Sequence, residues 1–322
     1  LHLRAASSPR RWLLEGGVIL CIGAAMYCKE YAVVFPFVLV AVDAARMAAG
    51  RLPHAARRSA FACWGVAFGL LGSYLLIRYL LIGALGGVPM VGPGDQPLID
   101  EPLSVRWGTA AALLLTAARL LVAPYALNYF YCSGTVSLAG GLLDPWAVAG
   151  ALFAATLIAG AAWLAWRRRE IVPALAVALF LLLLGPSLNT VSVSGVMFAE
   201  RFLYLPLAGV ALLGAWALER LLRSRRAVLV ARVGVAAVCV LAAGMTIARV
   251  ADWESSKTLV SSAIDWYPES ACAQFRMGLA MMAENRPEAA ADWFEGSIET
   301  EPRSPRAWKE YGDALLRVGR YQ

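Results

Sequence analysis

Long apolar runs separated by short polar segments occupy the chain as far as residue 251. A helix that crosses a membrane needs about 20 consecutive, mostly apolar residues. Four runs reach that length: residues 60–80, 145–166, 202–222 and 227–248. A fifth run, residues 171–184, is shorter and ends at a Gly-Pro pair. The pattern predicts a polytopic membrane domain over residues 1–251.

Two further apolar runs are interrupted by charged side chains. Lys29 and Glu30 divide residues 18–45, which predicts two short helices joined by a tight turn. Arg119 lies near the end of residues 107–123, and an arginine that faces lipid at membrane depth is costly. We therefore predict that residues 107–123 form a re-entrant or interfacial segment that is buried against protein.

Beyond the membrane domain the apolar runs give way to a repeat. Gly278 and Gly312 are 34 residues apart, and so are Pro268 and Pro302. Tetratricopeptide repeats have this period and pair two helices in each unit. Residues 252–322 are therefore predicted to form an incomplete tetratricopeptide-repeat solenoid, with further repeats expected beyond the last residue. The fold class expected for the whole chain is all-α, a polytopic transmembrane helix bundle followed by this helical solenoid.

Composition agrees with a membrane protein, and the distribution of charge suggests its orientation. Hydrophobic residues make up 60% of the chain and charged residues 16%, with a mean hydropathy of +0.63, whereas soluble domains carry about 25% charged residues. The part before Asp252 contains 21 basic and 10 acidic residues, and the part from Asp252 onward contains 8 and 12. Short cytoplasmic loops of membrane proteins are rich in Lys and Arg. Binding to nucleic acid is therefore the weaker explanation of the pI near 9.3, and no nucleic-acid partner is expected.

Clusters of arginine predict which segments face the cytoplasm. The four clusters are Arg4, Arg10 and Arg11; Arg46, Arg51, Arg57 and Arg58; Arg167, Arg168 and Arg169; and Arg220, Arg223, Arg225 and Arg226. The segments between them then lie on the outer side, including an outer-face subdomain over about residues 83–143. The tail is expected on that side too, which is the periplasm for a bacterial inner membrane, or the lumen in a eukaryotic cell.

Two pairs of charged residues on the outer side are candidate functional residues. Lys29 and Glu30 would lie in a turn below the outer surface, where ionisable residues are functional by default; the alternative is an interfacial turn whose two charges pair. Arg201 begins an apolar run, where a helix N-terminus favours anions and a guanidinium donates two hydrogen bonds to a phosphate. Tyr204, one turn further on, could reach the same ligand. The alternative here is a Glu200–Arg201 ion pair, with Tyr204 as an interface anchor.

Other polar and aromatic residues give weaker indications. Arg119 could hold an anionic lipid head group or pair within the outer-face subdomain. Residues 129–131, a Tyr-Phe-Tyr run, are interpreted as an aromatic belt at the membrane interface. The six cysteines show neither metal-ligand spacing nor a legible disulfide framework, and Cys21, Cys63 and Cys239 are interpreted as small core residues. No metal cofactor is indicated.

Three segments, in the same order along the chain, resemble a known family. Residues 198–206, FAERFLYLP, resemble the A-E-R-Y-L-Y-L-P signature of the transmembrane and tetratricopeptide-repeat O-mannosyltransferases and their bacterial relatives. Residues 28–30, CKE, followed by FP at 35–36, resemble the family's S-K-E…L-P segment. Residues 96–98 and 119–124 resemble its outer loop, which carries N-P and then R-L-L-x-x-P.

The resemblance implies a membrane glycosyltransferase of the GT-C superfamily, of which this chain holds the C-terminal portion. Such an enzyme takes a sugar, here mannose-like, from a polyprenyl phosphate carrier and passes it to a protein or peptide acceptor, which the tetratricopeptide repeats would bind on the outer side. The donor phosphate would be bound by Lys29, Glu30, Arg119, Glu200, Arg201 and Tyr204, with the two glutamates orienting the bases. The catalytic carboxylate is expected in a first outer loop that would precede Leu1, so the catalytic residue is unknown. Phe130 departs from the family, in which relatives often carry Asp.

Two other functions compete with this one. A non-catalytic, membrane-anchored tetratricopeptide scaffold for envelope or polysaccharide assembly fits the repeat, because such arrays present extended binding surfaces. Ionisable residues at membrane depth disfavour it, since an anchor does not need them. A transporter has less in its favour, because the sequence shows no inverted repeat and a single Gly-Pro break.

Overall fold

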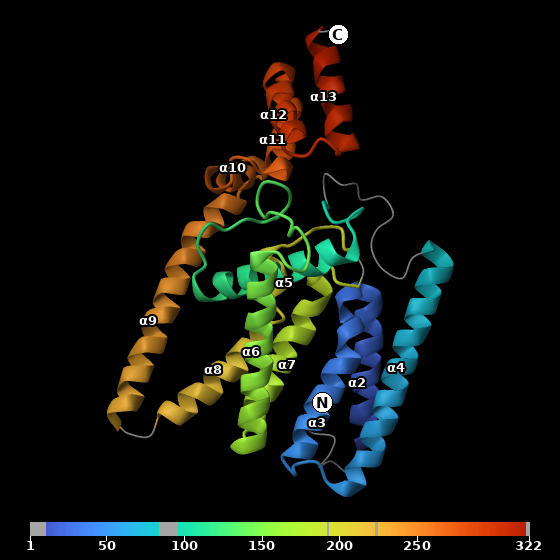
Figure 1. Ribbon diagram of the computed structural model, residues 1–322, viewed down its shortest axis with the longest axis vertical. Helices are drawn as coiled ribbons and strands as arrows, with labels where there is room; N and C mark the ends of the chain where they lie inside the picture. Colours follow the sequence, from blue (N-terminus) through green and yellow to red (C-terminus); the bar gives the residue numbers. More distant parts are fainter. Residues whose placement is uncertain (1–10, 84–95, 192, 223–224, 320–322) are drawn as a thin grey trace. The chain divides into compact units, whose positions relative to one another are not determined.

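The computed structural model describes residues 11–83, 96–191, 193–222 and 225–319, and the named elements of these residues are all helices (Figure 1). The α-helices are α2 (Arg11–Cys28), α3 (Phe35–Ala48), α4 (His54–Ile82), α5 (Leu103–Val122), α6 (Pro145–Arg167), α7 (Ile171–Leu184), α8 (Leu207–Leu221), α9 (Arg225–Val250), α10 (Ser256–Trp266), α11 (Ala271–Ala283), α12 (Pro287–Thr300) and α13 (Pro305–Val318). Four 3₁₀ helices are η1 (Glu30–Val34), η2 (Gly185–Leu188), η3 (Glu200–Leu203) and η4 (Ala251–Trp253). The all-α class is confirmed for these residues. Arg4, Arg10 and Arg223 of the predicted basic clusters lie outside them.

Among the residues that the structure describes, six helical segments are long and apolar enough to cross a membrane: Glu30–Ala48, Ala56–Ile82, Leu103–Val122, Pro145–Arg167, Ile171–Leu188 and Arg226–Trp253. They confirm the prediction of a membrane protein with several transmembrane helices. The prediction of a spanning helix over residues 202–222 is wrong, because η3 and α8 divide this run and α8 has only 15 residues. Pro206 lies between the two elements, and proline has no N–H with which to continue a helical hydrogen-bond ladder.

The chain divides into two compact units, and unit 1 holds Leu1–Gly87, Ala155–Pro186 and Leu205–Trp216. Within unit 1, α2 and α3 both pack against α4, and α3 also packs against α7 (Figure 1). The first part of α8 approaches α7 closely at Gly209, where a Cβ atom would lie 2.5 Å from the carbonyl oxygen of Ala176. A residue without a side chain is therefore what allows the two backbones to meet.

The predicted break at Lys29 is confirmed. α2 ends at Cys28, Lys29 adopts an extended backbone conformation, and η1 begins at Glu30. α3 then starts with Pro36 in its first turn, where proline is favoured because the N–H that it lacks has no helical partner there. Two helices joined by a tight connection therefore replace one long membrane helix.

Unit 2 holds Val88–Ala154, Ser187–Tyr204 and Ala217–Gln322. In it, α5 is one uninterrupted helix with buried residues that include Leu113 and Leu120, so the predicted burial of this segment against protein is confirmed. α5 crosses the beginning of α6, where a Cβ atom on Gly150 would collide with the Ala111 carbonyl group. A re-entrant segment reverses direction and α5 does not, so that form of the prediction is wrong. A position of α5 at the membrane interface stays a prediction, because α5 is also long enough to span a membrane.

Helices α10 to α13, the tail of unit 2, pack each against the next along the chain (Figure 1). Ser255, Ser270 and Ser304 precede α10, α11 and α13, and each side chain accepts a backbone N–H of the first turn, the hydrogen bond that stabilises a helix start. The core between α11 and α12 is built around Phe294, which is fully buried. The tail is thus a run of short helices that share one apolar core, and α10, α11 and α13 begin with a serine cap.

Replacing Gly278 with alanine is expected to destabilise the tail by about 1–3 kcal/mol. A Cβ atom at this position would lie 2.5 Å from Cε1 of Phe294, and that ring is packed on all sides. Gly312 is the matched control, because no atom of the described residues lies within 4 Å of its Cβ position, and alanine there adds up to about 1 kcal/mol of helix propensity. Thermal unfolding followed by circular dichroism in detergent should shift in opposite directions for the two variants; equal shifts would contradict the packing argument.

Candidate functional site

Glu200 holds the start of η3 against the loop that follows α5. Its Oε1 accepts hydrogen bonds from the backbone N–H of Asn128 and from the hydroxyl of Tyr131, the latter at 3.4 Å. The backbone N–H of Tyr131 donates to the Phe198 carbonyl oxygen at 3.0 Å, which forms an isolated antiparallel bridge. Phe198 and Tyr131 are both fully buried and their rings meet edge to face. Phe198 and Glu200 of the FAERFLYLP segment are therefore bonded directly to the outer loop.

Burial raises the pKa of the Glu200 carboxyl above its ordinary value, although the Asn128 N–H and the nearby Arg249 oppose the shift. In the native protein this carboxyl keeps its proton at pH values where the unfolded chain, with a pKa near 4.5, has lost it. Unfolding then releases a proton, so the free energy of unfolding falls as the pH rises from about 4.5 through the raised native pKa.

Replacing Glu200 with glutamine should remove this part of the pH dependence, because glutamine keeps an acceptor oxygen but does not titrate. Thermal unfolding between about pH 4.5 and pH 7 measures the difference. Glu254→Gln is the control, since Glu254 is exposed and belongs to the same unit. If the Glu200→Gln variant loses stability over this range as steeply as the wild type, the raised pKa does not contribute to stability.

A buried amide network supports the loop that leads into η3. Gln96 donates from Nε2 to the Asn189 side-chain oxygen at 3.3 Å and to the Ser194 carbonyl oxygen at 2.9 Å. Asn189 in turn donates to the carbonyl oxygen of Met197 at 2.8 Å. Asn189 has a φ of 56°, a left-handed conformation that asparagine tolerates better than most residues. Sequence reasoning singled out the segment around Gln96 by its resemblance to a family, but missed Asn189, because a lone asparagine carries no pattern.

Arg119 lies in the last turn of α5 and faces a cavity. Its Nη1 donates to the Tyr125 carbonyl oxygen at 3.2 Å, and its guanidinium stacks on the Tyr125 ring at 5.0 Å. The cavity has a volume of about 610 Å³, which is the size of known small-molecule sites. Its polar and aromatic walls include Thr116, Arg119, Tyr131, Asp144, Trp146 and Tyr267.

These walls suit an anionic ligand with a less polar part. A guanidinium donates charge-assisted hydrogen bonds to phosphate oxygens, and the exposed ring of Trp146 offers an apolar surface. Burial raises the pKa of the Tyr131 hydroxyl, which therefore stays protonated and donates its hydrogen to Glu200. The Asp144 carboxylate accepts from the backbone N–H groups of Gly140 at 3.1 Å and Trp146 at 2.9 Å, and these bonds lower its pKa.

Arg201 and Tyr204 do not line this cavity. Arg201 is exposed, donates to the Tyr129 carbonyl oxygen at 3.4 Å and stacks on Phe202 at 5.4 Å, while Tyr204 is 79% exposed. Glu200 bonds to the outer loop instead of Arg201, so neither the alternative ion pair nor the expected orienting role is found. The predicted helix N-terminus at Arg201 is also wrong, because η3 has only four residues, too few for a significant dipole.

Lys29 and Glu30 belong to unit 1, apart from the unit that carries Arg119, Glu200, Arg201 and Tyr204. Glu30 pairs with Arg78 of α4 at 3.1 Å, and Lys29 is exposed with no side-chain hydrogen bond or ion pair to a described residue. Glu30 therefore balances Arg78, and its expected role of orienting Lys29 stays a prediction. In the same unit, the buried Asp43, which sequence reasoning missed, accepts from Trp64 Nε1 at 3.0 Å.

A disulfide joins the outer loop to the tail. Cys132 and Cys272 are bonded across a separation of 140 residues. Beside them, the Ala271 N–H donates to the Ser133 carbonyl oxygen at 3.1 Å, and the Ser133 hydroxyl donates to Glu301 at 2.7 Å. The beginning of α11 is therefore fixed covalently and by hydrogen bonds to the loop that also lines the cavity.

This disulfide corrects the sequence interpretation of the cysteines. Spacing could not reveal a pair so far apart among six cysteines. Cys21 and Cys239, interpreted as core residues, are exposed, whereas Cys63 is buried as expected. The aromatic-belt interpretation of residues 129–131 is also wrong, because Phe130 and Tyr131 are buried inside unit 2. A run of aromatic residues is found both at membrane interfaces and in protein cores, so the sequence could not distinguish the two.

No family model, curated protein or solved structure matches the chain. In the part of the chain that the structure describes, no group of three or more His, Cys, Asp or Glu residues could hold a metal ion. The functional assignment therefore depends on the geometry of the cavity around Arg119 and on the sequence segments that build it.

Proposed function

We propose that the protein is a membrane glycosyltransferase of GT-C type, which transfers a mannose-like sugar from a polyprenyl phosphate carrier to a protein acceptor. The observation that carries this proposal is the cavity of about 610 Å³ that contains the Arg119 guanidinium. Its wall residue Tyr131 is held by Glu200 of the FAERFLYLP segment. A cation in a cavity of this size, framed by the two segments that resemble the family, suits the phosphate of a lipid-linked sugar.

In this reaction the acceptor hydroxyl oxygen attacks the anomeric carbon of the sugar. The bond between that carbon and the phosphate oxygen breaks, and the electron pair stays on the lipid phosphate that leaves. Arg119 stabilises this developing charge, as cations do in phosphate-leaving reactions, while the Tyr131 hydroxyl is held by Glu200. The proton of the acceptor hydroxyl passes to a base that is not assigned to a residue of this chain.

The tail is proposed to be a tetratricopeptide array that binds the acceptor. The close approach of α11 and α12 at Gly278, against Phe294, and the 34-residue spacing of Gly278 and Gly312 support this class of repeat. The Cys132–Cys272 disulfide supports an oxidising compartment, because such bonds persist in the periplasm or the lumen but rarely in the cytosol. The cavity and the tail would then face the same compartment as the acceptor.

A transfer assay tests the proposal against the scaffold alternative. Full-length protein in liposomes is given radiolabelled mannosyl undecaprenyl phosphate or mannosyl dolichyl phosphate, with a mixture of Ser- and Thr-containing peptides. We expect time-dependent transfer of label to peptide with one of the two donors. A non-catalytic scaffold would bind peptides without transferring label, and that result with both donors would overturn the proposal.

A further inference from the structure

Three consecutive arginines lie at the corner of unit 1 where α6 ends and α7 begins (Figure 1). Arg167 is the last residue of α6, which is long and apolar enough to cross a membrane. Arg168 and Arg169 follow it, and all three side chains are exposed. The end of a spanning helix lies at the membrane interface, where long basic side chains extend toward the lipid head groups.

Two tryptophan rings hold the first two guanidinium groups. Cζ of Arg167 lies 5.7 Å from the centre of the Trp166 ring, and Cζ of Arg168 lies 5.8 Å from that of Trp163. Both tryptophans are at least half exposed, at 73% and 50%, and exposed tryptophan is typical of the head-group level of a membrane. A guanidinium that stacks through its flat face can still donate hydrogen bonds from its edge. Each pair therefore combines an apolar surface for acyl chains with donors for a phosphate.

The third arginine occupies a position that the backbone would assign to glycine. Arg169 has a φ of 58°, a left-handed conformation that strains residues with a side chain. The N–H of Glu170 donates to the Leu164 carbonyl oxygen at 3.1 Å, and in a helix end closed by this hydrogen bond the left-handed residue is usually glycine. The turn itself gives no reason for an arginine, so what Arg169 contributes is its side chain.

Carboxylates do not neutralise these three arginines. None of their guanidinium groups forms a hydrogen bond or an ion pair with a residue that the structure describes. The adjacent acidic residue, Glu170, accepts from Trp216 Nε1 of α8 at 3.2 Å. A phosphate group can therefore receive charge-assisted hydrogen bonds from the arginines without first displacing an ion pair.

We propose that the α6–α7 corner, which consists of Trp163, Trp166, Arg167, Arg168 and Arg169, binds the phosphate of an anionic phospholipid in the membrane leaflet at which α6 ends. Charge complementarity selects an anionic head group over a zwitterionic one, whose cationic part repels the guanidinium groups. The exposed tryptophan rings suit acyl chains, which a soluble phosphate lacks. This lipid site is independent of the proposed sugar transfer.

Native mass spectrometry of the full-length protein in detergent tests the corner by counting bound lipids during a titration. The probes are phosphatidylglycerol and phosphatidylcholine with the same acyl chains. Each arginine beside an anionic lipid contributes about fivefold in affinity, so we expect the wild type to bind phosphatidylglycerol at least about tenfold more tightly than phosphatidylcholine. The double variant Arg167→Gln with Arg168→Gln should lower this preference at least about fivefold.

Arg169→Gly separates the side chain from the backbone. Glycine relieves the left-handed strain, so the unfolding temperature should not fall, whereas the affinity for phosphatidylglycerol should drop about fivefold. A purely structural role of Arg169 would produce no loss of affinity, and that result would contradict the proposal.

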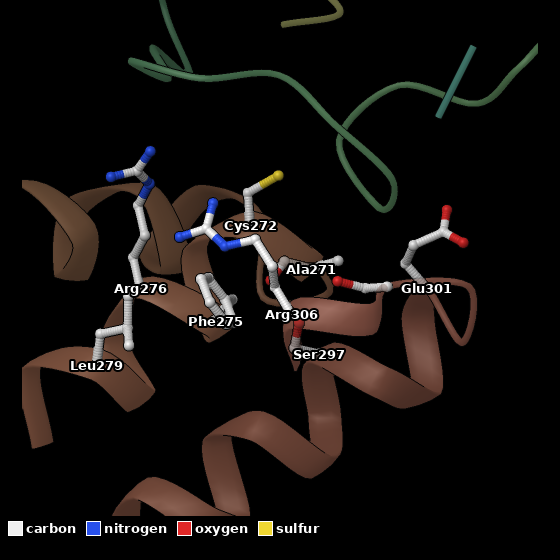
Figure 2. Close-up of a pocket in the computed structure, with 9 residues that line it drawn as sticks. Ala271, Cys272, Phe275, Arg276, Leu279, Ser297, Glu301 and Arg306 are labelled. Carbon is white, nitrogen blue, oxygen red and sulfur yellow. The ribbon is translucent and has the colours of Figure 1, made fainter. Parts of the chain in front are cut away.

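Two control variants distinguish a built site from general attraction between positive and negative charge. Arg51→Gln with Arg58→Gln removes two exposed arginines of the same unit, and Arg276→Gln removes an arginine of the tail, drawn in Figure 2, that lies 5.5 Å from the centre of the Phe130 ring. Both variants should keep the preference for phosphatidylglycerol. The proposal is overturned if either control lowers the preference as far as the double variant of the corner does, or if the wild type binds the two lipids alike.

Glycerol phosphate, which carries the phosphate without acyl chains, is the competitor that tests the source of the ligand. It should leave bound phosphatidylglycerol in place at equal concentration, because it makes no contact with the tryptophan rings through acyl chains. Displacement would assign the corner to soluble phosphates and overturn the lipid proposal. Because the assay contains no sugar donor and no acceptor, its failure leaves the transfer proposal standing, and absence of transfer leaves the lipid result standing.

Discussion

Replacing Arg119 with alanine is expected to lower the rate of sugar transfer by about 10²–10³-fold, the usual effect of removing one group that stabilises charge in a transition state. Arg119 is the arginine in the cavity wall, and the charge that develops on the leaving phosphate has no other cation assigned to it. The fold should survive, because Arg119 is bonded to the exposed loop at Tyr125 through its guanidinium and stacks on the Tyr125 ring, and neither contact belongs to the buried core. The measurement is the initial rate of label transfer in the liposome assay, at saturating and at limiting donor.

One further variant separates the charge of Arg119 from its shape, and a second serves as a control. Arg119→Lys keeps the charge but loses the planar pair of donors, so we expect a loss smaller than that of the alanine variant. Arg317→Ala removes an exposed arginine of the tail and should transfer at the wild-type rate. If Arg119→Ala stays within about twofold of the wild type, the assignment of phosphate stabilisation to this residue is wrong. Arg201→Ala should have the smaller effect, because Arg201 lies outside the cavity wall.

Removing the Cys132–Cys272 disulfide is expected to have the largest effect on stability. A bond that closes a loop of 140 residues restricts the unfolded chain strongly, and loss of such a bond costs about 2–5 kcal/mol. For a domain of this size the unfolding temperature should fall by about 5–15 °C. We expect the unfolding temperatures of the Cys132→Ser and Cys272→Ser variants to fall equally. In both variants, limited proteolysis should cut the chain between the outer loop and α11.

The four remaining cysteines provide the control for this experiment. Cys239→Ser removes an exposed free thiol of α9 and should leave the unfolding temperature unchanged. Mild reduction should lower the unfolding temperature of the wild type and of Cys239→Ser, but not that of either disulfide variant. A wild-type protein with six reactive thiols, purified without reductant, would contradict the pairing.

The sequence by itself determined which segments form membrane-length helices, where one of them is interrupted and where the tail begins. Three of the four apolar runs of membrane-spanning length became single helices. The run that contains Lys29 and Glu30 was broken there, and ionisable residues at membrane depth are costly in lipid. The 34-residue spacing of Gly278 and Gly312 drew attention to the tail, and at Gly278 the side chain of Phe294 leaves no room for a Cβ atom. The segments around Gln96, Arg119 and Glu200 were also singled out from the sequence, through their resemblance to a family.

Only the tertiary structure decided which of these residues meet. It placed Arg119 in a cavity wall, directed Glu200 to the outer loop instead of Arg201, and paired Glu30 with Arg78 instead of Lys29. It also joined Cys132 to Cys272. Sequence patterns report whether a residue is buried, through periodicity along one element, but they do not report its neighbours, because contacts across 70 to 140 residues depend on how separate elements pack. Glu200 is an example. Its burial against the outer loop raises the pKa of its carboxyl and so governs its charge state. Its position next to Arg201 in the sequence does not reveal this.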